Sequence, residues 1–116
     1  MLGLMLMVLA ADAAPLKDAE GATWKTESKT EMLGGGMASR RLFKVFRNGK
    51  EVGTVEGGSF HQENPRISGG TEWKFEIVAG VFEARGTTVR FEKDKRTESV
   101  TVLRWNGKGL LPATAP

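Results

Sequence analysis

The only histidine of the chain is the first place to look for catalytic chemistry. His61 has Ser59 two residues before it and Glu63 two residues after it. A hydrolase needs a nucleophile that is hydrogen-bonded to a base, and a third group that orients the base. Three residues this close in an extended loop seldom converge, and one imidazole with one carboxylate gives fewer protein ligands than zinc takes. We therefore predict a solvated loop histidine, with no catalytic residue and no metal site.

Acidic residues on predicted strands could in principle supply the carboxylate pair of a glycosidase. They alternate with Lys and Arg at positions that a soluble sheet turns toward solvent, so we predict surface carboxylates at Glu72, Glu76, Glu83, Glu92 and Glu98. The glycine run Gly34–Gly36 lacks the GxxxxGK[ST] context of a phosphate-binding loop and precedes no predicted helix. The sequence therefore predicts a protein that is not an enzyme and that uses no cofactor.

Positive charge is most concentrated between residues 40 and 50, where basic side chains alternate with Phe43 and Phe46. Single-stranded nucleic-acid binders use such arrays, because cations track phosphate while rings stack on bases. The same array suits an acidic glycan, lipid head groups or a protein partner. The alternative is that a phenylalanine faces the core and the cations only solubilise the surface. The predicted binding residues are Arg40, Arg41, Lys44 and Arg47.

Length and composition limit the chain to one domain. At 116 residues it can bury a single core. It has no cysteine, which excludes a disulfide scaffold, a thiolate metal site and a cysteine nucleophile. It carries 17 Lys and Arg against 14 Asp and Glu, a net charge of +3. This balance permits an anionic partner without requiring one.

The opening segment MLGLMLMVLAADAAP differs in composition from the rest of the chain. Its apolar run is too short to cross a bilayer, since a spanning helix needs about 20 apolar residues. Ala11 and Ala13 supply the small residues that signal peptidase favours, so we predict a signal peptide at 1–13. The segment lacks the usual Lys or Arg near its start, and the alternative is an apolar first strand. With the signal the protein is secreted or periplasmic, and without it cytoplasmic.

Apolar and polar residues alternate with the period of a β-strand after a polar leader at 15–21. The early predicted strands are Thr23–Thr30, Arg40–Arg47 and Glu51–Val55. Two glycine-rich stretches, Glu31–Ala38 and Gly57–Gly70, are predicted to be loops. The second loop is long for a compact domain, and loops of that length are often functional or mobile.

Two Asn-Gly pairs, Asn48-Gly49 and Asn106-Gly107, stand at the ends of predicted strands. Both residue types accept the positive φ angles of a two-residue type I′ hairpin turn. We therefore predict turns at both places and no ligand site at either. At the first turn, the expected hairpin pairs Val45 with Val52 and Leu42 with Val55.

The second half of the chain predicts a meander of strands over Glu72–Glu83, Thr87–Lys93 and Glu98–Trp105. A bulge or turn is expected at Ala79-Gly80, a turn at Arg85-Gly86 and a hairpin loop at Asp94–Thr97. Lys74 and Glu76 are expected to face solvent. The predicted core residues are Trp73, Phe75, Ile77, Val89, Phe91, Val100 and Val102.

These patterns predict an all-β fold, a single-domain antiparallel β-sandwich or small β-barrel of about six to seven short strands. The domain is expected to cover residues 14–112, followed by a tail at 113–116. We expect a small exported, non-catalytic binding module for an anionic glycan, an envelope component or a protein partner. One alternative is an OB-like single-stranded nucleic-acid binder, which export disfavours. Another is an enzyme inhibitor that inserts the Gly57–Gly70 loop into a cleft.

Overall fold

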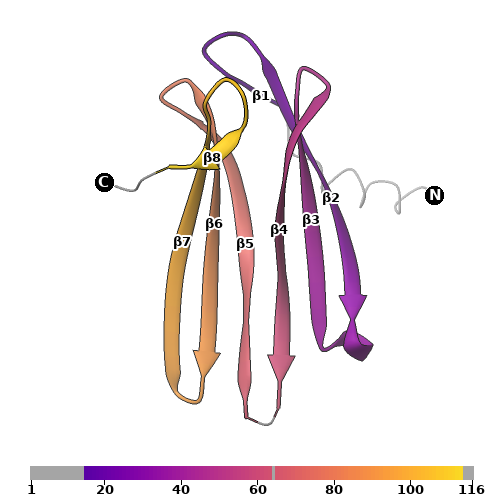
Figure 1. Ribbon diagram of the computed structural model, residues 1–116. Helices are drawn as coiled ribbons and strands as arrows, with labels where there is room; N and C mark the ends of the chain where they lie inside the picture. The colour runs from indigo at the N-terminus through magenta and orange to yellow at the C-terminus, as the bar shows by residue number, and fades with distance from the viewer. Residues whose placement is uncertain (1–14, 64, 114–116) are drawn as a thin grey trace, which may run out of the picture.

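The computed structural model describes residues 15–63 and 65–113, so the predicted signal peptide at 1–13 and most of the tail lie outside the described residues. Eight strands form one antiparallel sheet in the order of the chain (Figure 1). The strands are β1 (Leu16–Lys17), β2 (Thr23–Leu33), β3 (Ala38–Arg47), β4 (Lys50–Gln62), β5 (Ile67–Val78), β6 (Val81–Glu92), β7 (Lys95–Trp105) and β8 (Leu110–Pro112). A short 3₁₀ turn, η1 (Gly34–Gly36), joins β2 to β3. The predicted all-β antiparallel class is confirmed.

The sheet is a single open one and does not close into a barrel, because β1 and β8 stand at its opposite ends. Its six central strands contain 10 to 13 residues each and are longer than the short strands that we predicted. The glycine-rich stretches that were expected to be loops account for much of this extra length. β2 runs on to Leu33, and β4 and β5 run through most of Gly57–Gly70.

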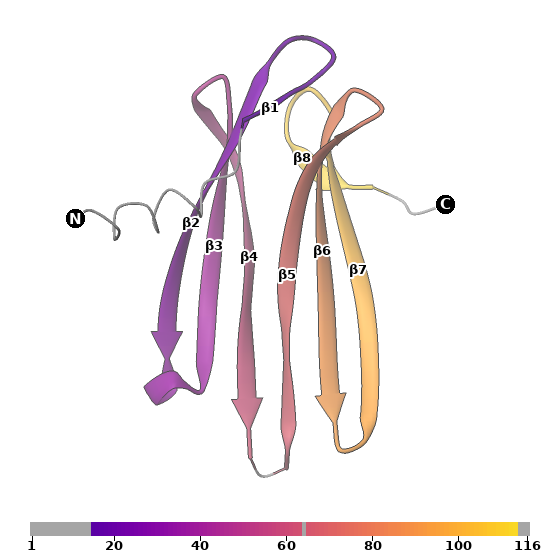
Figure 2. The same cartoon turned by 180° about the vertical axis from the view of Figure 1, so that it is seen from behind.

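The sheet divides along the boundary between β4 and β5. These two strands pair only where Gly58–Gln62 of β4 meets Ile67–Thr71 of β5. Figure 2 shows them side by side near their shared turn and apart at the other end. We call β1–β4 the N-leaf and β5–β8 the C-leaf. We call the end of the sheet that carries β1 and β8 the core end; β4 and β5 are not paired there. The opposite end, which carries the connections at 34–37, 63–66 and 93–94, is the hairpin end.

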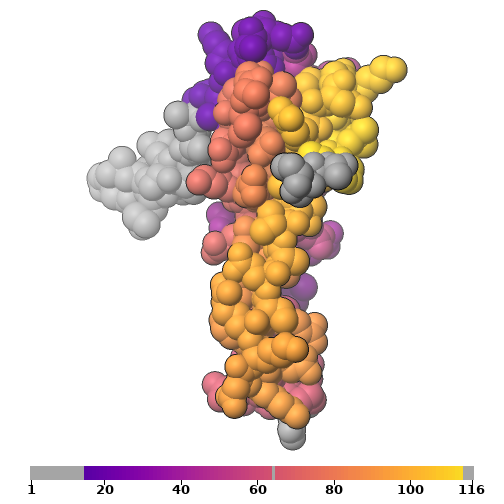
Figure 3. Space-filling view, turned by 90° about the vertical axis from the view of Figure 1, so that its left-hand side faces the viewer, coloured from indigo at the N-terminus to yellow at the C-terminus, as the bar shows by residue number. Residues whose placement is uncertain are grey.

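The hydrophobic core lies between the two leaves at the core end. Trp24 of the N-leaf stacks on Phe82 of the C-leaf with ring centroids 4.2 Å apart, and both are 1% exposed or less. The edge of Trp24 meets Trp105 of β7 at 5.3 Å, and Val45 and Ala84 complete the buried cluster. Figure 3 shows that the molecule narrows from this end toward the hairpin end. The packing of the leaves is therefore confined to one half of the strands.

The turn at Asn48-Gly49 is confirmed, with φ angles of 49° and 82°. The predicted pairing beyond it is wrong by one residue, because Val45 lies opposite Gly53 and Val55 lies opposite Phe43. A β-bulge between Val45 and Phe46 leaves Val52 as an extra residue on β4. Bulges insert one residue in this way and shift the register beyond them. The second Asn-Gly pair also forms a turn, in which the Asn106 side chain accepts bonds from two backbone amides.

The stretch Gly57–Gly70 forms strands because its glycines allow strands to approach closely. A Cβ atom at Gly58 would collide with the carbonyl oxygen of Ser39, and one at Gly69 with that of Val89. Glycine inside a strand often marks such an approach or a bend. The prediction of a long loop is therefore wrong, because β4 continues to Gln62 and β5 begins at Ile67.

The predicted core of the second half is correct near the core end and wrong farther away. Trp73, Phe75 and Ile77 pack against the buried cluster, whereas Phe91 is 46% exposed and Val100 48%. Arg85-Gly86 is not a turn but lies inside β6. The loop expected at Asp94–Thr97 is a tight turn at residues 93–94. As a result β6 and β7 extend past the core, and Phe91 and Val100 lie beyond the part of the sheet that packing covers.

One predicted surface carboxylate, Glu83, is buried. It is 6% exposed, and its carboxylate lies 3.5 Å from Nε of Arg104 and 3.6 Å from Nη2 of Arg85. The alternating pattern predicted that Glu83 faces solvent, and this prediction is wrong. Glu83 follows Phe82 at the core end, where both faces of β6 are covered. Two arginines compensate its buried charge, as buried carboxylates require.

Candidate binding groove

The four predicted binding residues do not form one patch, because they alternate along β3. Arg41 and Arg47 share the face of the buried Val45, whereas Arg40 and Lys44 point the other way. The sequence placed these cations close together along the chain, and the strand then separates them onto two faces of the sheet.

Arg47 is part of the fold at the core end. Its Nη2 donates to Glu20 at 3.1 Å, its Nε lies 3.9 Å from a carboxylate oxygen of Asp18, and its guanidinium stands 5.6 Å from the Trp105 ring centroid. Cations over aromatic faces are attracted by the ring quadrupole. Arg47 therefore links both leaves and has little freedom to bind a ligand.

Arg40 and Lys44, on the opposite face of β3, differ in their carboxylate partners. Arg40 donates from Nε to Glu56 at 2.9 Å and lies 3.9 Å from Glu31, so two carboxylates match its charge. Lys44 is exposed and lies opposite Glu27 in the pairing of β2 with β3. Neither residue borders the groove that lies between the leaves.

Arg41 lines this groove, which has a volume of about 340 Å³ and lies at the junction of the two leaves. The groove is also lined by Thr30, Ser39, Phe43, Gly58, Ser59, Thr71, Glu72 and Trp73. The N-leaf supplies one wall and the C-leaf the other, with the paired glycine-rich parts of β4 and β5 between them. Sites where two layers separate are common places for ligand binding.

Contacts with neighbouring residues position Arg41 on one wall of the groove and Trp73 on the other. The guanidinium of Arg41 stands 5.3 Å from the centroid of the Phe43 ring, which itself meets Phe75 edge to face at 5.3 Å. On the other wall, Nε1 of Trp73 donates to the backbone oxygen of Glu56 at 2.8 Å. The Trp73 ring also rests against Gly86, where any side chain would collide with it. Within residues 15–63 and 65–113, no carboxylate comes within ion-pair distance of Arg41.

Residues with hydroxyl groups also line the groove. The hydroxyls of Ser39 and Ser59 are hydrogen-bonded at 2.8 Å, and Ser39 also accepts from the backbone amide of Ser59 at 3.1 Å. Thr71 is bonded to Thr88 at 2.7 Å. Each hydroxyl keeps acceptor capacity for a further partner. Together with Glu72, the groove offers one cation, one carboxylate, an indole and several hydroxyls, a mixture that suits a hydroxyl-rich polar ligand.

A larger hollow of about 610 Å³ beside the β6–β7 turn is a weaker candidate. It is lined only by residues between Arg90 and Thr97, all of them exposed and most of them charged. Long charged side chains at a hairpin tip keep many rotamers, so fixing them around a ligand costs conformational entropy. The groove at the leaf junction is better ordered because rings and paired backbone hold its walls.

The histidine segment does not assemble a triad. Ser59 is bonded to Ser39, whereas Nε2 of His61 contacts the Glu63 carboxylate. The hydrogen bond from His61 lowers the pKa of Glu63 below its ordinary value. Across the described part of the chain there is no group of three or more His, Cys, Asp or Glu residues that could hold a metal ion. His61 lies on β4 and not in the loop that we expected.

Sequence reasoning missed Asp18, which lies in the polar leader at 15–21. One carboxylate oxygen accepts from the amides of Glu20 and Ala22, and the other from Nε1 of Trp24, each at 2.9 Å. The bond from Trp24, followed by the backbone bonds and nearby Arg47, lowers the pKa of Asp18 even though burial acts in the opposite direction. This carboxylate fixes the central tryptophan of the core and is structural.

Comparison with known proteins provides no family for the chain. No protein-family model, no curated protein and no solved structure matches it. Residues 15–63 and 65–113 contain no helix with the length and hydrophobicity needed to cross a membrane. The function therefore has to be argued from the residues of the groove.

Proposed function

We propose that the protein is an exported, non-catalytic binding module and that the groove at the leaf junction holds an acidic sugar unit of a glycan. The observation that supports this most is the position of Arg41. Of the four cations on β3, it alone lines the groove, beside hydroxyls and facing the wall that carries Trp73. A guanidinium matches a carboxylate or sulfate group in a bidentate geometry.

The dimensions and chemistry of the groove favour a sugar over a larger aromatic ligand. A volume of about 340 Å³ is at the small end of ligand sites. The hydroxyls of Thr30, Ser39 and Thr71 can exchange hydrogen bonds with those of a sugar, and the indole of Trp73 offers an apolar surface for its C–H groups. Glu72 can accept from sugar hydroxyls, and its charge sets an upper limit on the affinity for anions.

The nucleic-acid alternative is less well supported by the aromatic residues that suggested it. Arg41 stands over the ring of Phe43, which also packs against Phe75, so less of this ring is accessible to a base. Phe46 lies on the other face of β3 and does not border the groove. Base stacking requires an accessible ring. The inhibitor alternative required a long loop at Gly57–Gly70, and these residues form strands.

The proposal is tested by the affinity for a soluble polyuronate, a neutral dextran and single-stranded DNA at low and high salt. Arg41→Gln should weaken polyuronate binding about tenfold or more, since a charge-assisted hydrogen bond contributes about 1.5–3 kcal/mol. Lys44→Gln is the matched control, because it removes the same charge from the opposite face of β3. Glu72→Gln should strengthen binding by removing the repelling carboxylate.

The affinity should also fall as salt rises, because screening shortens to about 3 Å at 1 M. Equal losses for Arg41→Gln and Lys44→Gln would show that only overall charge matters and would reject the groove. Preference for DNA over the polyuronate would support the nucleic-acid alternative instead. Tight binding of dextran by the Arg41 variant would show that the groove binds neutral sugars.

A further inference from the structure

The outer edge of β2 is open over most of its length. β1 pairs only with Thr23 and Trp24, while β3 occupies the other side of β2 from Trp24 to Leu33. In the described part of the chain, no strand covers the outer edge from Lys25 onward. The residues along it, except the half-buried Thr26, are exposed. A free edge of this length is a template for pairing with another strand.

The sequence of this edge, KTESKTE from Lys25 to Glu31, is complementary to itself in antiparallel pairing. If Ser28 lies opposite Ser28 of a second copy, Lys25 lies opposite Glu31 and Glu27 opposite Lys29. Thr26 then lies opposite Thr30. Because the arrangement is two-fold symmetric, each ion pair occurs twice, and all four charged positions point to the same face of the strand. Opposite charges directly across an antiparallel pair stabilise it.

Neighbouring registers are disfavoured by the same charges. A shift by two residues in one direction places Lys29 opposite itself and Glu27 opposite Glu31. A shift in the other direction places Glu27 opposite itself and Lys25 opposite Lys29. Like charges directly across a strand pair are destabilising, and a shift by one residue would put the charged side chains opposite residues of the other face. The charge pattern therefore favours the register centred on Ser28 over its neighbours.

The self-complementary segment Lys25–Glu31 begins directly after the part of the β2 edge that β1 covers. β1 occupies the position beside Trp24, so a partner strand can extend no farther than the residue opposite Lys25. That residue is Glu31, after which β2 approaches its turn at η1. The charged residues of this edge form few ion pairs with other described residues of the same chain. Glu31 lies 3.9 Å from the exposed Arg40, and no other charged residue of the edge makes an ion pair with a described residue.

The free edge of β7, at the other side of the sheet, is not complementary in charge to itself. Among the described residues, β8 covers β7 from Leu103 to Trp105, and the amide of Ala113 donates to the oxygen of Val102 at 2.8 Å, which leaves Lys95 to Thr101 open. This stretch carries Lys95 and Arg96 but only one carboxylate, Glu98, which already pairs with Arg96 at 2.8 Å. Two cations cannot both be matched by one carboxylate in a self-pairing. The two edges therefore differ in their suitability for a second copy.

We propose that the protein forms a two-fold symmetric dimer in which the β2 edges of two copies pair antiparallel about Ser28. The two sheets join into one continuous sheet across the interface. Isologous interfaces of this kind are the commonest in soluble oligomers, because each copy presents the same self-complementary surface. The groove of the proposed function shares only Thr30 with the paired segment, and none of the charged residues of the edge lines the groove. Charge variants of the edge therefore test dimerisation separately from glycan binding.

Charge exchange on the edge tests the proposal directly. One variant combines Lys25→Glu with Lys29→Glu, and a second combines Glu27→Lys with Glu31→Lys. Each makes the edge carry one sign of charge, so each alone should be monomeric by sedimentation at concentrations where the parent is a dimer. Mixed in equal amounts, the two variants should form a heterodimer, since every opposed pair is then of opposite sign. Lys95→Glu on the β7 edge is the control and should leave the parent dimer intact.

A cysteine at the symmetry axis gives an independent test, because the chain has no cysteine of its own. Ser28→Cys should form a covalent dimer on mild oxidation, whereas Lys44→Cys, on the neighbouring strand, should not. A parent that stays monomeric at all concentrations tested would overturn the proposal. A dimer that survives in both charge variants, or a mixture of them that stays monomeric, would overturn it equally.

Discussion

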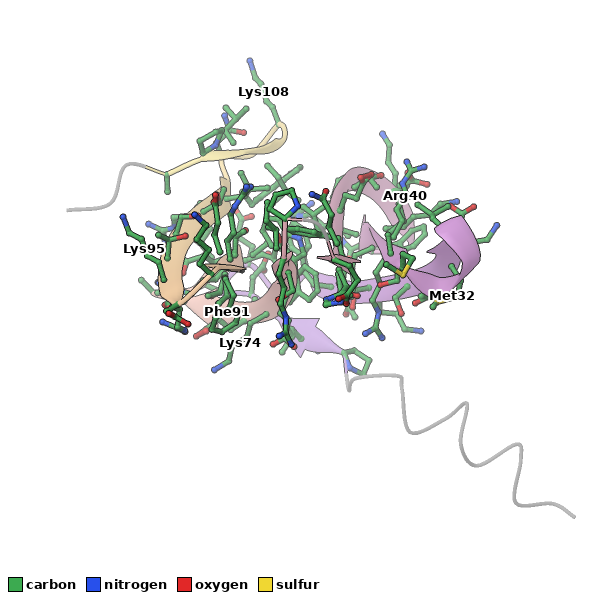
Figure 4. The ribbon with its side chains drawn as sticks, turned by 90° about the horizontal axis from the view of Figure 1, so that it is seen from below. Met32, Arg40, Lys74, Phe91, Lys95 and Lys108 are labelled. Atoms are coloured by element: carbon green, nitrogen blue, oxygen red, sulfur yellow. The ribbon has the colours of Figure 1, made fainter. Side chains whose placement is uncertain are left out.

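The core end and the hairpin end are built from the same six long strands, but only the core end has a second layer. At the core end, Trp24 and Phe82 of opposite leaves stack and are 1% exposed or less. At the hairpin end, Met32 on β2 is 66% exposed and Phe91 on β6 is 46% exposed (Figure 4). An alternating strand offers an apolar face, but that face is buried only if another layer covers it.

The two ends also differ in how they connect to the rest of the chain. Asp18, Arg47 and Glu83 make polar contacts across or beside the core, and the amide of Ala19 donates to the oxygen of Gly80 at 2.9 Å between the leaves. At the hairpin end, the side-chain hydrogen bonds between described strands join sheet neighbours, such as Ser39 with Ser59 and Thr71 with Thr88. We infer that the core end sets global stability and that the hairpin end opens locally at lower cost.

The largest expected effect sets one phenylalanine of each end against the other. Phe82→Ala removes a ring that is 0% exposed and should cost about 3–5 kcal/mol in the free energy of unfolding. Phe91→Ala removes the same atoms from a half-exposed site and should cost less than about 1 kcal/mol. Chemical denaturation of both variants measures the difference. Similar losses would mean that the hairpin end is packed as well as the core end.

A second expected effect is the dependence of the core end on Asp18. The folded-state pKa of this carboxyl lies below the ordinary value of 3.8. Its ionised form therefore contributes stability that is complete above this value and is lost as the pH falls toward the lowered pKa. Asp18→Asn should melt at a lower temperature than the parent at pH 7, and the gap should narrow below pH 3.8. A constant gap over this range would show that the charge of Asp18 contributes nothing.

A smaller effect is expected at the turns. Gly49 at the core end has φ of 82° and Gly35 at the hairpin end has φ of 67°, and at both positions the space that a Cβ atom would occupy has no neighbour within 4 Å. Gly49→Val should cost about 1–2 kcal/mol, because a left-handed conformation is unfavourable for a residue with a Cβ. Gly35→Val has a similar local strain but should lower global stability less, since fraying of the β2–β3 hairpin can relieve it. Thermal denaturation of both variants measures the two losses, and equal losses would indicate that both ends unfold together.

The smallest expected effect is on the exposed stretch of β7. Val100 is 48% exposed, so Val100→Thr should change the free energy of unfolding by no more than about 0.5 kcal/mol. Thr keeps the β-branched shape that suits a strand. A loss well above this value would show that Val100 is covered by a partner in solution, on the edge that our dimer leaves free.

Much of the local structure could be predicted from residue types. The Asn48-Gly49 turn required only positive φ at both positions, and the outward direction of Lys74 required only the period of a strand. The register beyond that turn could not be predicted, because the bulge at Val45 and Phe46 depends on packing at the core end. The sequence predicted only part of the groove. Arg41 was expected to bind a ligand, whereas Trp73 was predicted only as a core residue. Trp73 lies on β5, which is distant in sequence from Arg41 on β3.

The sequence by itself determined the all-β class, the positions of both Asn-Gly turns and the face of β5 that carries Trp73, Phe75 and Ile77. These depend on backbone dihedrals and on a period of two, which neighbouring residues set. Only the tertiary structure decided which apolar faces are buried, which of the four cations borders a groove, and that the glycines of Gly57–Gly70 lie in strands. Burial and close approach depend on what lies across the sheet, and the faces of the two leaves bury a core only at the core end.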